Sequence, residues 1–206
     1  MAEKINISSL KFDTYMNRSV MDFSVALGDK ESTLRAGGAS SAIGAIAAAS
    51  AQKAVRMSAG DDPAMNKVSN DLETLRKYLI FLIDEEIKAK DPLLKRLGTD
   101  IPAEELEAAW RTACTIIDEQ LYTIAKIVDV VEPVADKICP CAVAEACAAM
   151  FYAKAAMNSI RIQMAEYSTH MIDEVYAHTT RREPEIAIEQ CTPAIDKIVK
   201  TLEAKL

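Results

Sequence analysis

The chain has 206 residues, of which 50% are hydrophobic and only 5% aromatic, and its formal net charge at neutral pH is −7. An acidic chain without a basic stripe is not expected to have nucleic acid as its main partner. The apolar fraction can form a sizeable core, and a composition rich in alanine and poor in aromatics favours helices packed on helices.

The sequence also bears on the location of the protein. Residues 1–11 lack the apolar core that secretory signal peptides carry. The small-residue run 36–51 is too weakly hydrophobic for a membrane span, and polar residues follow it at once. We therefore expect a cytoplasmic protein without membrane insertion. We also expect a single domain over residues 1–206, with a mobile tail at residues 1–10.

A helical spacing of apolar residues covers 12–27 and stops at Gly28. The next stretch, 34–56, opens with Gly37 and Gly38 and contains almost nothing larger than alanine before its end. Alanine favours helix, and side chains this small let a backbone or a flat ligand approach closely. The stretch predicts a helix that ends near 58–60. This helix is either a tightly packed core element alone or also a site, because the N–H groups at its start suit an anion or a polarised carbonyl.

The following helices have clear apolar stripes. The Asp-Asp-Pro run at 61–63 marks a helix start, and apolar positions spaced by three and four continue over 63–90. The Asp-Pro pair at 91–92 is expected to end or kink this helix. The next helix is predicted over 103–131, with an interruption at the Glu-Pro pair 132–133.

The last part of the chain predicts a helix over 141–176, a polar junction at 178–184 and a final amphipathic helix over 186–206. No segment shows the alternation of apolar and polar residues that half-buried strands require. The sequence therefore predicts an all-α fold, a single antiparallel bundle of about six helices.

Five cysteines are present, at positions 114, 139, 141, 147 and 191. An odd number in a chain of this length without a signal peptide does not indicate a disulfide framework. Cys139, Cys141 and Cys147 could form a metal or redox cluster, but they lack the second ligand pair of common zinc sites. Packing as small hydrophobic groups is the favoured role, and no metal site is predicted.

Two carboxylates are candidates for acid–base chemistry. Glu86 lies at the edge of the apolar stripe of 63–90, and Glu145 is the only charged residue between Lys137 and Lys154. Such a carboxylate is either solvated or buried with a raised pKa, and raised-pKa carboxylates serve acid–base catalysis near neutral pH. The two histidines lie in polar surroundings and are weak candidates. The sequence contains no phosphate-binding loop, dinucleotide fingerprint or His-Glu-x-x-His motif.

The order of these segments resembles the formimidoyltetrahydrofolate cyclodeaminase and methenyltetrahydrofolate cyclohydrolase family, from about Met21 to the C-terminus. The Pro-Gly-Gly-Gly-Ser/Gly turn of the family matches residues 35–39, and its Asp-x-Asp-Ala-x-Ala-Phe helix end matches 84–90. Its Ser-Asp-x-x-x-Ala segment matches 144–149. The chain departs from the family in a turn without the proline and one glycine, in alanine at position 144, and in an acidic segment at 57–62 where the family is basic.

The resemblance implies an enzyme of one-carbon metabolism that acts on a tetrahydrofolate substrate and needs neither metal nor further cofactor. Water would add to the methenyl carbon in hydrolysis, whereas N10 would attack the formimino carbon and release ammonia in deamination. The implied catalytic acids are Glu86 and Glu145, and the implied substrate-binding residues are Gly37, Gly38, Arg35 and Ser40. These roles require both carboxylates to meet over one glycine-lined hollow. The resemblance also implies a homodimer.

Two alternatives remain open. The chain could be a catalytically silent or repurposed family member that binds a small molecule or a partner protein, or it could be a plain helical oligomerisation module. Loss of methenyltetrahydrofolate absorbance on adding the protein, compared with the spontaneous rate, separates an enzyme from both.

Overall fold

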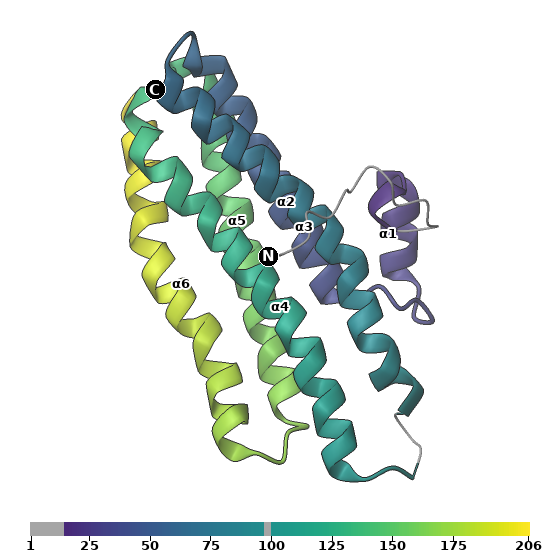
Figure 1. Ribbon diagram of the computed structural model, residues 1–206. Coiled ribbons are helices and arrows are strands. Elements are labelled where there is room, and N and C mark those ends of the chain that lie inside the picture. The colour runs from purple at the N-terminus through teal and green to yellow at the C-terminus, as the bar shows by residue number, and fades with distance from the viewer. Residues whose placement is uncertain (1–14, 97–99) are drawn as a thin grey trace.

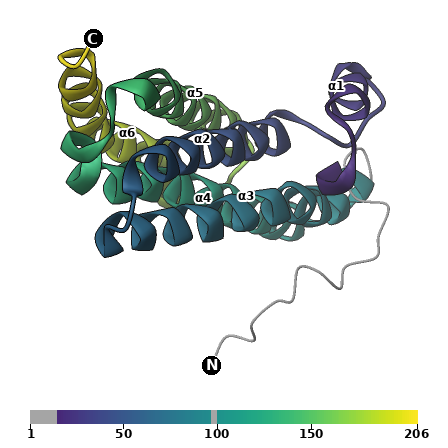
Figure 2. The same cartoon turned by 90° about the horizontal axis from the view of Figure 1, so that it is seen from above.

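The structure, a computed structural model, describes residues 15–96 and 100–206, and these residues form helices without strands (Figure 1). The α-helices are α1 (Val20–Gly28), α2 (Ala36–Ala59), α3 (Pro63–Arg96), α4 (Ala103–Val131), α5 (Val143–Ser168) and α6 (Glu174–Glu203), and the 3-10 helices are η2 (Tyr15–Asn17), η3 (Glu132–Lys137) and η4 (Pro140–Ala142). Helices α2 to α6 form an antiparallel bundle, and α1 stands apart from it (Figure 2). The predicted all-α bundle is confirmed, whereas the tail expected at 1–10 lies outside the described residues.

Helix α2 lies inside the bundle and packs against both α3 and α5 (Figure 2). Its small residues allow close approach: a Cβ atom added at Gly44 would lie only 2.7 Å from the side chain of Ile124 on α4. The helix ends where Gly60 adopts a positive φ of 48°, a conformation that glycine adopts without steric cost. The predicted small-residue helix and its end near 58–60 are therefore confirmed.

Helix α3 is longer than the sequence pattern indicates. The end or kink expected at 91–92 is wrong, because the helix continues to Arg96. Leu93, on the additional turn, is buried in the core. Burial of a leucine side chain contributes about 1.5–3 kcal/mol, which offsets the backbone hydrogen bond that a proline removes.

The junction between the last two helices also differs from the prediction. The polar run 178–184 lies inside α6, and the chain turns at 169–173 instead. Asp173 fixes the start of α6, because its carboxylate accepts hydrogen bonds from the backbone N–H groups of Val175 and Tyr176. A polar run was a weak stop signal here, since one face of an amphipathic helix is polar throughout.

The helix predicted over 12–27 is interrupted, because η2 ends at Asn17 and α1 begins at Val20, although α1 does stop at Gly28 as predicted. Helix α4 covers 103–131 as predicted, and the Glu-Pro pair 132–133 opens η3. Within residues 15–96 and 100–206, none of the helices combines the length and the apolar character that crossing a bilayer requires.

The cysteines divide into two groups. Cys114 and Cys191 are buried and free, as expected of small hydrophobic groups. Cys139 and Cys141 are instead joined by a disulfide in the loop before α5, so the prediction that they serve only as packing groups is wrong. The spacing of the cysteines does not predict this disulfide. Two cysteines separated by one proline form a disulfide only when the local turn brings their side chains together.

Asp118 on α4 is a partly buried acid in an unfavourable environment. Burial, reinforced by the negative charges of Glu183 and Glu119, raises its pKa to about 7. Its Oδ1 atom makes no hydrogen bond to any residue that the structure describes. The folded protein therefore holds a proton at Asp118 that the unfolded chain releases near pH 4.

We predict that folding stability falls as the pH rises from about 4 to 7, because the unfolded carboxylate ionises over this range and the folded one does not. An Asp118→Asn variant keeps the protonated shape and should unfold at a higher temperature than the parent at pH 8, with little difference at pH 4. Thermal melts at both pH values test this. Asp129→Asn, the same change at an exposed site on α4, should alter neither melt, and an equal gain there would contradict the prediction.

Candidate functional site

Four helix ends meet at one end of the bundle and build the candidate site. Helices α2 and α4 begin there and α3 and α5 end there, because neighbouring helices run antiparallel (Figure 1). Residues far apart in sequence are thereby brought together: Gly37 of α2 and Gln163 of α5 both contact Glu86 of α3.

Glu86 is fully buried and forms an ion pair with Lys90, one helical turn further along α3. The distance from Lys90 Nζ to Glu86 Oε1 is 2.6 Å, and the two side chains are 2% and 0% exposed. The Nε2 group of Gln163 donates a second hydrogen bond to Oε1, at 3.2 Å. The other carboxylate oxygen, Oε2, makes no hydrogen bond to a described residue. Glu86 was predicted to lie at the edge of the apolar stripe, but it lies in the core.

Gly37 makes room for this ion pair. A Cβ atom at Gly37 would lie 2.6 Å from Glu86 Oε1 and 2.9 Å from Gln163 Oε1, closer than real Cβ contacts allow. A residue without a side chain is therefore required where α2 crosses the buried carboxylate.

Lys90 is the unusual member of the pair. Burial lowers the pKa of its ammonium below the ordinary value, and the adjacent Glu86 carboxylate opposes this effect. A lysine of this kind exchanges protons closer to neutral pH than a solvated one.

A cavity of about 530 Å³ opens beside the ion pair. Lys90 and Gln163 contribute to its wall, but Glu86 lies behind them. Three other lining side chains carry aromatic rings, those of Trp110, Tyr167 and His170. Two carry cationic groups and lie at the α2 side, Lys30 and Arg35. Lys90 is therefore the member of the ion pair that lines the cavity.

The aromatic wall of the cavity is centred on Trp110. Its ring stacks on His170 with centroids 4.3 Å apart, and Tyr167 meets it edge-on at 4.9 Å. Two buried polar atoms of lining residues, Trp110 Nε1 and Gln163 Oε1, make no hydrogen bond to a described residue. Buried polar atoms are normally hydrogen-bonded. Both atoms are sealed from solvent, so a ligand in the cavity would reach them only after neighbouring side chains move.

The turn after His170 is anchored to α4. The carboxylate of Glu107 accepts hydrogen bonds from the backbone N–H groups of Ile172, at 3.0 Å, and Asp173, at 3.3 Å. Arg111 bridges Glu107 and Asp173. This network fixes the exposed end of α5 against the helix that carries Trp110.

Only one of the four predicted substrate-binding residues lines the cavity. Arg35 lines the cavity. Gly37, Gly38 and Ser40 are buried and do not line it, and Ser40 Oγ donates to the carbonyl of Ala36 in its own helix at 2.7 Å. The glycines therefore shape the wall from behind.

Glu145 does not meet Glu86 in this chain, so the expectation of two carboxylates over one hollow is wrong. Glu145 lies in the first turn of α5, eighteen residues before Gln163, which is about 27 Å along the helix. It is partly exposed and pairs with Lys53 at 2.8 Å. That hydrogen bond lowers the pKa of Glu145, the opposite of the shift expected for a catalytic acid.

The sequence did not assign Lys90, Trp110, Gln163 or Tyr167 to the site, and His170 was only a weak candidate. The weak signals were the spacing of four between Glu86 and Lys90 and between Gln163 and Tyr167, which places each pair on one helix face. Their convergence depends on how four helices pack, which periodicity does not encode.

We predict that Gly37→Ala displaces Glu86 and lowers the free energy of unfolding by about 1–3 kcal/mol, as overpacking does in well-packed cores. Urea denaturation measures this loss. The matched control is Gly28→Ala, because a Cβ at Gly28 meets nothing within 4 Å. Equal stability of the two variants would contradict the packing account.

Comparison with known proteins identifies the family and the fold. A family model described as formiminotransferase-cyclodeaminase matches residues 19–185, and no curated protein matched. The chain is similar to the crystal structure of formiminotetrahydrofolate cyclodeaminase from Thermotoga maritima, with a TM-score of 0.80 and 17% identity over 91% of this chain and 98% of that chain. The structural likeness shows a shared fold. Because the family model covers most of the sequence, the chain belongs to the formiminotransferase-cyclodeaminase family.

Proposed function

We propose that this protein is a folate-dependent one-carbon enzyme of the cyclodeaminase or cyclohydrolase type. Its substrate would be a reduced folate that carries a one-carbon unit on N5 or between N5 and N10. The observation that carries the proposal is the cavity that lies beside the buried Glu86–Lys90 pair and is lined by the rings of Trp110 and Tyr167.

The cavity suits the parts of a folate. Its volume of about 530 Å³ lies within the usual range for small-molecule sites. The aromatic wall supports a flat pterin ring. The indole N–H of Trp110 and the amide oxygen of Gln163 would hydrogen-bond to its polar edge once the side chains that cover them move. Lys30 and Arg35 line the cavity together with Asp29 and Glu166, and the two cationic side chains can pair with the carboxylates of a glutamate tail.

Lys90 is the group that we assign to proton transfer, with Glu86 as its buried counter-ion. In hydrolysis, water adds to the methenyl carbon and gives up a proton to the neutral Lys90 amine. The ammonium so formed protonates the departing ring nitrogen as the carbon–nitrogen bond breaks, and the hydroxyl group of the adduct loses its proton to solvent as the formyl C=O forms. In deamination, N10 attacks the formimino carbon; the N10 proton and one proton from the Lys90 ammonium are transferred to the formimino nitrogen, the carbon–nitrogen bond breaks, and ammonia leaves. Neither route needs a metal or a second cofactor.

Glu86 supports both protonation states of Lys90. Its carboxylate stabilises the ammonium, while burial favours the neutral amine. The two effects keep both forms accessible, as a group that alternates between acid and base requires. This role replaces the direct one that the sequence indicated for Glu86, since Lys90 and Gln163 separate it from the cavity.

The test is the absorbance of methenyltetrahydrofolate, followed as it is consumed from the methenyl form or produced from the formimino form. A Glu86→Gln/Lys90→Met double variant is the sharpest probe, because removing one partner leaves an uncompensated buried charge whereas replacing both is far better tolerated. We expect kcat/KM to fall by about 100-fold or more, with helical content retained by circular dichroism.

The matched control is Glu145→Gln/Lys53→Met, which removes the partly exposed ion pair near the other end of α2. It should keep full activity. Turnover that survives loss of the buried pair, or that depends on the control pair, would contradict the proposed mechanism. Saturable folate binding without turnover by the parent protein would instead support the silent family member.

We also propose that the protein is a homodimer, as the family resemblance implies. Its apolar surface supports this assembly: α1 projects from the bundle with Val20 88% exposed, and Ile46 on the neighbouring face of α2 is 54% exposed. Between α1 and α2 lies an apolar groove of about 430 Å³. Apolar surface of this kind typically marks an association site.

An Ile46→Glu variant should therefore be monomeric, or dissociate at much higher concentration than the parent, when its mass is measured by light scattering. A charge buried at a subunit interface without a partner opposes association. The matched control is Ile162→Glu, at an equally exposed isoleucine of α5, 58% accessible, which should keep the parent mass. Dissociation by the control alone would place the interface elsewhere.

A further inference from the structure

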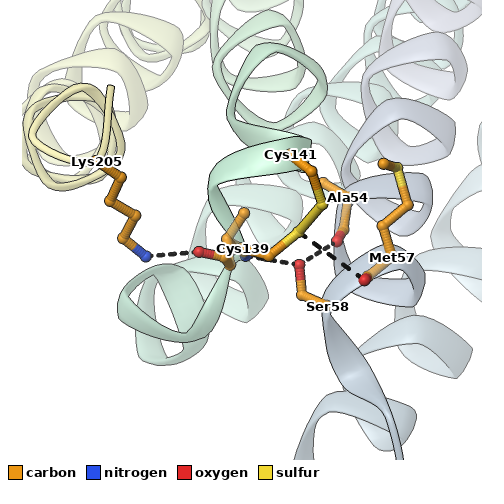
Figure 3. Close-up of a disulfide and its surroundings, with 7 residues drawn as sticks. Ala54, Met57, Ser58, Cys139, Cys141 and Lys205 are labelled. Atoms are coloured by element: carbon orange, nitrogen blue, oxygen red, sulfur yellow. Dashed lines mark hydrogen bonds between the residues drawn. A yellow bond between two sulfur atoms is a disulfide. The ribbon is translucent and has the colours of Figure 1, made fainter.

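The disulfide between Cys139 and Cys141 lies in the loop that leads into α5 (Figure 3). This loop packs against the C-terminal end of α2, and the candidate cavity lies at the start of the same helix. Helix α2 has 24 residues, so about 36 Å separate its two ends. Any chemistry of the disulfide is therefore independent of the proposed folate reaction.

The bond is a weak structural staple. It closes a loop of three residues, with only Pro140 between the cysteines, and a loop this short removes little entropy from the unfolded chain. The loop is also held without it. The Cys139 N–H donates to Ser58 Oγ at 2.8 Å, and Lys205 Nζ donates to the carbonyls of Asp136 and Ile138 at 2.7 Å each.

The two cysteines differ in exposure, and a cation binds the backbone beside them. Cys141 is exposed and Cys139 is partly exposed. The Lys205 ammonium is bound to the peptide carbonyl directly before Cys139, as Figure 3 shows. Cys141 precedes the first residue of α5 by two positions. A cation and a helix N-terminus both stabilise thiolates, and a stabilised thiolate is a better leaving group in disulfide exchange.

We propose that Cys139 and Cys141 form a thiol–disulfide exchange site that small thiols of the glutathione kind open and close reversibly in the folded protein. The fold holds the loop in either state, and the pair is open to solvent. The disulfide is thus a modification site on this protein rather than a part of its stability.

The exchange proceeds in two balanced steps. A thiolate attacks the sulfur of Cys141, an exposed residue, the sulfur–sulfur bond breaks, and the electron pair leaves on the sulfur of Cys139. A second thiolate then attacks the outer sulfur of the mixed disulfide and releases Cys141. Overall, two small thiols are oxidised to one small disulfide, and the protein disulfide is reduced to a dithiol that keeps the two protons.

The other cysteines do not compete for this chemistry. Cys114 and Cys191 are buried, and Cys147 is partly buried. Burial raises the pKa of each of these thiols, that of Cys114 to about 12. Thiols with raised pKa values contain little of the thiolate that reacts.

The experiment equilibrates the folded full-length chain in buffers that range from reduced to oxidised glutathione, traps free thiols with N-ethylmaleimide, and measures intact mass followed by peptide mapping. We expect two N-ethylmaleimide adducts, on Cys139 and Cys141, to appear together as the buffer becomes more reducing. Both should be lost together when the series is run from reduced to oxidised glutathione. Reduction should lower Tm by only about 2–6 °C. A Cys141→Ser variant should carry one glutathione on Cys139, and Cys147→Ser should leave the two-adduct transition unchanged.

Two results would overturn the proposal. The pair could stay oxidised at every glutathione ratio until the protein is denatured, which would make it a structural disulfide. Alternatively, it could stay reduced in oxidised glutathione, which would mean that the folded loop does not support the bond.

Discussion

The buried ion pair between Glu86 and Lys90 is the constraint on which the cavity end of this protein depends. Removing two charges from water costs several kcal/mol per ion, so the pair is tolerated only with close contact and further hydrogen bonds. The 2.6 Å contact and the Gln163 amide supply both. The same requirement explains Gly37, because any side chain there would collide with the carboxylate.

The antiparallel bundle converts this local constraint into a site. Because the starts of α2 and α4 meet the ends of α3 and α5, the ion pair, the aromatic wall and the cavity share one end of the molecule. The opposite end holds Ser58, Lys205 and the disulfide loop. The long helices therefore separate two regions of different chemistry by roughly their own length.

Much of the fold followed from the sequence, and less of the site did. Apolar stripes predicted α3 and α4, and small residues predicted that α2 would pack closely on its neighbours, because these patterns report burial on one face. Glu86 and Glu145 gave the same local signal, a lone acid on an apolar face, yet one is sealed in the core and the other pairs with Lys53 near solvent. The difference lies in which helix end each occupies, and this depends on tertiary packing. Lys90 escaped notice for the same reason.

The central claim is that the cavity beside the buried ion pair holds a reduced folate. Trp110 is the only tryptophan of the chain and lines that cavity, so its fluorescence reports ligand at this place alone. Titration with a stable reduced folate, such as 5-formyltetrahydrofolate, should change the emission saturably, and p-aminobenzoylglutamate, which lacks the pterin, should not reproduce the change. An emission that stays constant after correction for ligand absorbance, or that responds equally to both compounds, would contradict the account.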